Sequence, residues 1–130
     1  MQLKWINHAS YLVTHEEITL VCDPWLSGDA FDHGWSLLSE TKFTPNDFVD
    51  VTHIWFSHEH PDHFSPPNLK QIPAAVRANI TIIYQKTLDG RVASFCRAIG
   101  FKEVIEIAAG ERLKLSEHVS FRAYPYIHGD

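Results

Sequence analysis

The chain contains the run Ser57-His58-Glu59-His60-Pro61-Asp62-His63, which follows an apolar stretch typical of a buried strand. In an extended segment, side chains at positions i, i+2 and i+4 point to the same side. His58, His60 and Asp62 can therefore converge on one point, while His63 can reach a neighbouring point. The run predicts a site for one or two metal ions at the end of a strand.

The ligand types narrow the choice of metal. Imidazole nitrogen and carboxylate oxygen suit several divalent ions, and no cysteine lies near the run to select zinc by itself. We expect zinc first, with iron or manganese as alternatives, and one or two ions. The competing interpretation is that these histidines are solvated surface residues. Burying several unpaired ionisable groups would be costly, which favours the metal site.

The run His58-Glu59-His60-Pro61-Asp62-His63 resembles the signature of the metallo-β-lactamase superfamily. Upstream, residues 18–26 resemble the family's strand that ends in an aspartate, and Asn7-His8-Ala9-Ser10 resembles its opening hairpin loop. The resemblance covers the whole chain. It implies an αββα sandwich and metal-dependent hydrolysis, although some members of this superfamily are iron-dependent redox enzymes.

A narrower resemblance concerns residues 23–26, 30–31 and 34–38, which are similar to a branch that includes CMP-N-acetylneuraminate hydroxylase. This branch is linked to sugar-nucleotide chemistry. Its hydroxylases also use a Rieske iron-sulfur domain, which needs paired Cys-x-His and Cys-x-x-His ligands. Neither pair occurs in this sequence. Oxygenase chemistry would therefore require a separate electron donor on another chain.

The resemblance also implies that a distant strand supplies the third ligand of the first metal. His118 and His128 are the candidates. Ligands gather at the carboxyl ends of strands in open α/β sheets, and His128 follows the last predicted strand whereas His118 precedes it. His128 is therefore favoured. The predicted ligands are His58, His60 and His128 for the first metal, and Asp62 and His63 for the second.

Two aspartates receive further roles. Asp62 is the predicted catalytic residue, because it could orient or deprotonate the attacking water if one metal is missing. Asp23 is expected to accept the free N–H of a ligand imidazole and so orient it, without binding metal itself. The alternative for Asp23 is a turn-forming residue before Pro24. His8 could line the cleft, or it could be packed or solvated.

Strands and helices alternate along the chain. Apolar and β-branched runs predict strands, while Thr44 and Ser65, each followed by proline, predict helix starts. The expected strands are residues 2–6, 11–13, 18–22, 53–56, 80–84, 104–107, 112–115 and 119–124, with a loop over 28–40 and helices from 45, over 66–71 and over 91–99. This order predicts an α/β fold, the N-terminal half of an αββα sandwich with a mixed sheet.

Composition limits the partners. The chain has 130 residues, 45% of them hydrophobic, which is enough for one core, and we assign residues 1–130 to one domain. The net charge of −5 argues against a nucleic-acid partner, and no apolar run approaches membrane-spanning length. Two separated cysteines do not indicate disulfides. We expect a cytoplasmic protein that acts on a small-molecule substrate.

The superfamily pattern also needs an aspartate that bridges both metals and a final histidine, both far downstream of His63. The sequence ends at Asp130, so we expect the domain to be incomplete at its C-terminus, with the missing half supplied by a longer chain or by association. The second metal should then be weakly held, and turnover by this chain alone should be poor.

These observations favour a metal-dependent hydrolase that uses a metal-activated water on an ester, phosphodiester or amide-like bond. The first alternative is an iron-dependent oxygenase or redox component that acts on a sugar nucleotide. The second alternative is a non-catalytic half-domain or assembly piece.

Overall fold

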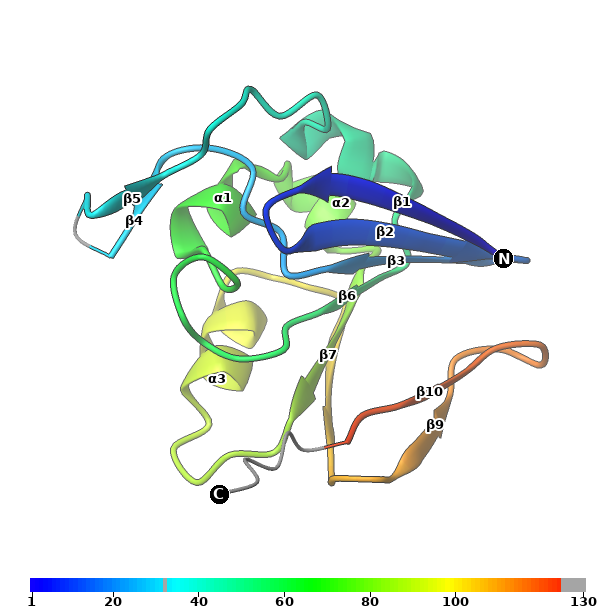
Figure 1. The fold of residues 1–130 in the computed structure, drawn as a ribbon. Coiled ribbons are helices and arrows are strands. Elements are labelled where there is room, and N and C mark those ends of the chain that lie inside the picture. Colours follow the sequence, from blue (N-terminus) through cyan, green and yellow to red (C-terminus); the bar gives the residue numbers. More distant parts are fainter. Residues whose placement is uncertain (32, 125–130) are drawn as a thin grey trace, which may run out of the picture.

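A computed structural model describes residues 1–31 and 33–124 of the chain (Figure 1). Its main feature is a six-stranded sheet with the strand order β1-β2-β3-β6-β7-β8. These strands are β1 (Gln2–Asn7), β2 (Ser10–His15), β3 (Ile18–Cys22), β6 (His53–Trp55), β7 (Thr81–Gln85) and β8 (Glu103–Ile107). The first three pair antiparallel, whereas β3, β6, β7 and β8 run parallel. The predicted mixed sheet is confirmed.

The helices cover one face of this sheet. They are α1 (Pro66–Gln71), α2 (Ala74–Arg77), α3 (Arg91–Ala98) and a 3-10 helix, η1 (Pro45–Asp50). The strand register aligns Val21, Ile54 and Ile82 in one row, and all three are buried in the same cluster as Leu69 and Cys96 of the helices. Alternate residues of a strand face opposite sides, so this row belongs to the helix side.

The other face of the sheet carries a smaller cluster. Cys22, Trp55 and Ile83 form the next row of the register, and they pack with Phe121 and Leu113. These last two residues belong to a separate two-stranded sheet, β9 (Arg112–Lys114) and β10 (Ser120–Arg122). In Figure 1 this hairpin lies across the main sheet from the helices. The described residues thus form three layers, of which the second sheet is the smallest.

The predicted helix starts are confirmed in position. Asp47 accepts a hydrogen bond from the backbone N–H of Thr44 at 2.7 Å, and the Ser65 hydroxyl accepts one from the backbone N–H of Asn68 at 3.4 Å. Such contacts satisfy donors that the first turn of a helix leaves unpaired. The first of these helices is a 3-10 helix, which is wound more tightly than an α-helix.

Other differences concern short elements. The loop expected over residues 28–40 contains a small hairpin of β4 (Asp29–Ala30) and β5 (Trp35–Ser36), and α2 was not predicted. Elements of two to four residues carry too little periodicity to stand out in a sequence. Within the ranges 1–31 and 33–124, no helix is long and apolar enough to cross a membrane.

Candidate metal centre

The topology brings three distant segments to one edge of the sheet. β3 and β6 are parallel neighbours, so the residues that follow them, Asp23 and the run from Ser57 onward, meet at the same edge. β2 pairs antiparallel with β3, with Tyr11 opposite Cys22. The turn between β1 and β2, which contains His8, therefore also lies at this edge. The sequence had left open whether His8 lines the cleft or is packed or solvated, and the strand register places it at this edge.

Four imidazoles and the carboxylate of Asp62 gather there as possible metal ligands. The ring centroids of His58 and His63 are 4.0 Å apart, and those of His58 and His60 are 4.5 Å apart. Two overlapping groups have ligand atoms within 4.8 Å of one another, His58 with His60 and Asp62, and His8 with Asp62 and His63. Asp62 is common to both, so this arrangement could serve two ions.

The surroundings of the Asp62 carboxylate indicate whether a metal ion fits this site. The residue is 5% exposed, and its Oδ1 is buried without a hydrogen-bond partner in the described part of the chain. Its Oδ2 lies 2.9 Å from His8 Nε2 and 3.2 Å from His63 Nε2. A buried carboxylate oxygen without a partner is costly, and a cation among these imidazoles would relieve that cost. The donor set therefore fits a divalent metal.

Electrostatics keep these groups in the forms that bind metal. Burial alone would raise the pKa of Asp62, but the hydrogen bond from His8 and the charge of His63 outweigh it and hold the pKa below its usual value. Burial, together with the nearby His63 and His60, lowers the pKa of His58. Carboxylate and neutral imidazole are the forms that coordinate metal ions.

A hydrogen-bond network sets the tautomers of two candidate ligands. Asp23 accepts hydrogen bonds from the backbone N–H of Ser57 at 2.6 Å and from the Ser57 hydroxyl at 2.7 Å, and its Oδ2 lies 2.8 Å from His63 Nδ1. Because a carboxylate only accepts, His63 must carry its proton on Nδ1. The Ser57 hydroxyl donates to Asp23 and so accepts from His58 Nδ1, 2.8 Å away. In their neutral form, both imidazoles then present a bare Nε2 to the centre.

Backbone conformation and neighbouring residues hold this edge in place. His8 and Asp23 both have φ of 49°, a left-handed conformation that is uncommon for residues other than glycine. Strain of this kind clusters at functional sites. Asn68 was not singled out from the sequence. Its buried amide accepts hydrogen bonds from the backbone N–H groups of Leu26 and Ser27, and so fixes the segment that follows Asp23.

The remaining predicted residues lie as follows. His128 is outside the described residues, so its predicted role as a ligand remains a prediction. His118 is exposed in the turn between β9 and β10 and belongs to neither ligand group. Glu59 faces away from the centre and forms an ion pair with Arg91 at 2.8 Å. Cys22 is buried, and burial raises the pKa of its thiol to about 12, which disfavours the metal-binding thiolate.

Two hollows flank the centre. One of about 920 Å³ is lined by Ser57 and His58 together with Tyr11 and Trp55. Another of about 450 Å³ is lined by His60, by the Glu59 and Arg91 ion pair and by apolar residues of the α1 and α3 region. Either could receive a substrate beside the predicted ligands.

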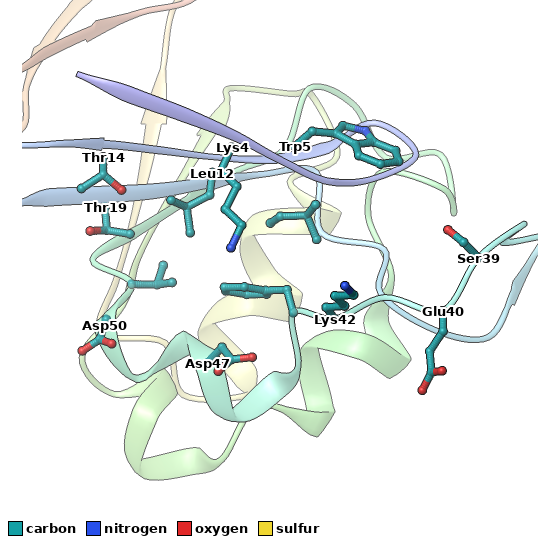
Figure 2. A pocket seen from close by; sticks show the side chains of 13 residues that line it. Lys4, Trp5, Leu12, Thr14, Thr19, Ser39, Glu40, Lys42, Asp47 and Asp50 are labelled. Carbon is teal, nitrogen blue, oxygen red and sulfur yellow. The ribbon is translucent and has the colours of Figure 1, made fainter.

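A third hollow is separate from the centre. It measures about 840 Å³ and lies between β1, β2 and η1, with Lys4 and Lys42 directed into it (Figure 2). None of its lining residues belongs to either ligand group.

A helix-covered mixed sheet with a histidine-rich loop at its carboxyl edge defines a fold of the metallo-β-lactamase type. The sequence matches the family described as "Beta-lactamase superfamily domain" over residues 2–123, and the chain belongs to that family.

The matches to individual proteins are partial. The chain is 38% identical over 76 residues to cytidine monophosphate-N-acetylneuraminic acid hydroxylase of Cricetulus griseus, covering 55% of this chain and 13% of that protein. A possible metal-dependent hydrolase of Veillonella parvula is similar in structure, with a TM-score of 0.66 and 22% identity, over 88% of this chain and 44% of that one. A mutant of CmlA beta-hydroxylase gives a TM-score of 0.67 and 22% identity, over 96% of this chain and 24% of that one. The chain corresponds to the N-terminal part of these structures.

Proposed function

We propose that the chain contributes the metal centre of a hydrolase that acts on an ester, phosphodiester or amide-like bond of a small molecule. The observation that carries this proposal is the buried, unpartnered Oδ1 of Asp62 among four imidazoles at the sheet edge. A purely structural aspartate would have its oxygens paired by protein donors. The flanking hollows leave room for a substrate next to the same atoms.

His58 and His60 would hold the first ion, with His128 as the ligand predicted from the sequence. Asp62 and His63 would hold the second. A bound divalent ion in such a site acts as a Lewis acid and allows water to serve as a nucleophile near neutral pH.

The chain's own residues position the reaction. Asp62 can orient the attacking water or accept its proton, because the pKa of its carboxyl lies below the usual value and the group is ionised at neutral pH. Ser57 and Asp23 hold the proton of the neutral His58 and His63 rings on Nδ1, which leaves each Nε2 available to a metal. Trp55, in the adjoining hollow, offers an apolar wall that can bind a substrate group and exclude water.

A second candidate is an iron-dependent hydroxylase. It is favoured by the 38% identity to a protein named as a hydroxylase. Nitrogen and carboxylate ligands with open positions also suit iron and dioxygen. This chemistry needs an electron donor, and the two cysteines, Cys22 and Cys96, are both buried and far apart in the sequence. The donor would therefore lie outside residues 1–130.

One experiment distinguishes these functions. The purified protein is stripped of metal, reloaded with zinc or ferrous iron, and assayed on chromogenic esters, phosphodiesters and amides, and for oxygen uptake with a chemical reductant. We expect hydrolysis of at least one bond class that disappears with chelator and returns with zinc. His60→Ala should abolish it, whereas His33→Ala, which changes a histidine outside both ligand groups, should not.

Reductant-dependent oxygen uptake by the iron-loaded protein, without hydrolysis of any bond class, would replace the hydrolase with the hydroxylase. A protein that binds no metal under any of these conditions would favour the non-catalytic interpretation.

A further inference from the structure

His8 occupies a position that its local sequence does not explain. It lies in the turn between β1 and β2 in a left-handed conformation, where glycine or asparagine is usual. Its ring packs edge-on against Trp25 and Trp35, with centroids 5.0 Å and 6.1 Å away. These contacts direct Nε2 to a point 2.9 Å from Oδ2 of Asp62, a residue 54 positions later. The side chain is one-third exposed, so burial alone does not account for its place.

The contact between His63 and Asp62 supplies the second observation. His63 carries its proton on Nδ1, because that atom faces the Asp23 carboxylate at 2.8 Å. In the neutral ring, which is the form that binds metal, Nε2 has only a lone pair, and it lies 3.2 Å from Oδ2 of Asp62. Two electron-rich atoms at this distance repel each other unless a proton or a metal cation lies between them, and a metal ion bound by both atoms would take the place of that proton.

The spacing of the three atoms matches one coordination sphere. Metal bonds of about 2.0 to 2.2 Å place two ligands of one ion roughly 3 to 3.5 Å apart. The distances from Oδ2 of Asp62 to the Nε2 atoms of His8 and His63 are 2.9 Å and 3.2 Å. All three ligand atoms lie within 4.8 Å of one another.

We propose that His8 is a direct ligand of the second metal ion and completes a three-residue site with Asp62 and His63. The site takes a divalent cation of borderline softness, such as zinc, manganese or ferrous iron. This inference rests on the metal centre of the proposed function but not on the reaction that the centre performs. The sequence had predicted only two protein ligands for the second ion, and His8 would raise this number to three.

The test compares His8→Asn with His33→Asn. Asparagine tolerates the left-handed conformation, so both substitutions preserve the backbone, and His33 has φ of 68° in a position outside both ligand groups. Binding of zinc and cobalt is measured by equilibrium dialysis without substrate. We expect the wild type and His33→Asn to bind two ions. In His8→Asn the first ion should remain, and the affinity for the second should fall by more than about 100-fold, beyond the effect typical of a residue that only orients a ligand.

Nuclear magnetic resonance of the histidine rings in the wild type gives an independent readout, which does not depend on how the variant folds. Direct coordination requires that the Nε2–H signal of His8 disappear when the second equivalent of zinc is added. A His8 that keeps this proton in the zinc-loaded protein only donates a hydrogen bond to Asp62, and the proposal would be wrong. Two-ion binding without hydrolysis would count against the proposed function alone, and a wild type that binds no metal would count against both.

Discussion

The substitution Asp23→Asn tests how this edge of the sheet prepares its ligands. Asp23 Oδ1 accepts the backbone N–H of Ser57 at 2.6 Å, so the amide oxygen of an asparagine would stay there. The amide NH₂ would then replace Oδ2, which lies 2.8 Å from His63 Nδ1. Two donors would face each other, and the imidazole would move its proton to Nε2. That nitrogen is the one that should bind metal.

The expected loss follows from this change of tautomer. Removing the partner that orients a metal-bound histidine costs about 10- to 100-fold in metal affinity, or about 1.4 to 2.7 kcal/mol. Asparagine also tolerates the left-handed backbone at this position, where φ is 49°, so the fold should be preserved. The effect should therefore fall on metal binding and not on folding.

The assay measures the metal dissociation constant by competition with a chromophoric chelator, and ring nitrogen shifts report the tautomer of His63. The matched control is Asp29→Asn, which removes a carboxylate paired with His33 at 3.0 Å on an exposed hairpin. The control should bind metal as the wild type does. Unchanged affinity in Asp23→Asn, or a metal-loaded structure in which Asp23 itself coordinates the ion, would refute the reasoning.

Three further predictions follow from the same structure. The double variant His58→Ala/His60→Ala should lose most of its bound metal, and elemental analysis that finds wild-type metal content would contradict this. Asn68→Ala should lower the free energy of unfolding in urea by about 2 to 4 kcal/mol, because buried backbone donors lose their acceptor; a loss below about 1 kcal/mol would count against that role. Burial raises the pKa of Cys96 from 9.0 to about 12, so the folded state keeps a proton that the unfolded state loses, and stability should fall as pH rises from 9 to 12. Cys96→Ala should reduce this slope by up to about 1.4 kcal/mol per pH unit, and an unchanged slope would exclude the thiol as its source.

The sequence predicted those parts of the fold that local pattern controls. The apolar run before His58 lies in β6, and the paired prolines after Ser65 begin α1. Both depend on signals within a few residues, namely a buried strand and a helix cap. The parallel order of β6, β7 and β8 follows from the alternation of strands and helices, because a helix is the usual crossover between parallel strands.

The contribution of His8 could not be predicted with the same assurance. Its contact with Asp62 depends on the register of two strand pairings, β1 with β2 and β2 with β3, which together bring the first turn to the end of β3. No signal within a few residues fixes such a contact. Residues 7–10 resemble the family's opening loop, but from the sequence His8 could line the cleft or could equally be packed or solvated.

The metal-free protein should be folded before any ion binds, because the core and the centre use different residues. The larger buried cluster lies under the helices and includes Ile54, Phe56 and Ile82, none of which is a predicted ligand. Asp23 and His8 hold left-handed conformations that cost on the order of 1 to 3 kcal/mol each. Such conformations persist only where the surrounding fold holds them, so the centre depends on the core for its shape. A metal that binds only the folded state then adds stability by mass action, about 2.7 kcal/mol at a free concentration 100 times its dissociation constant. This order of events differs from that in small zinc domains, which are unfolded without metal. If the protein folds first, the fold sets the positions of the predicted ligand atoms before metal binds. A metal ion would then occupy a site that already exists.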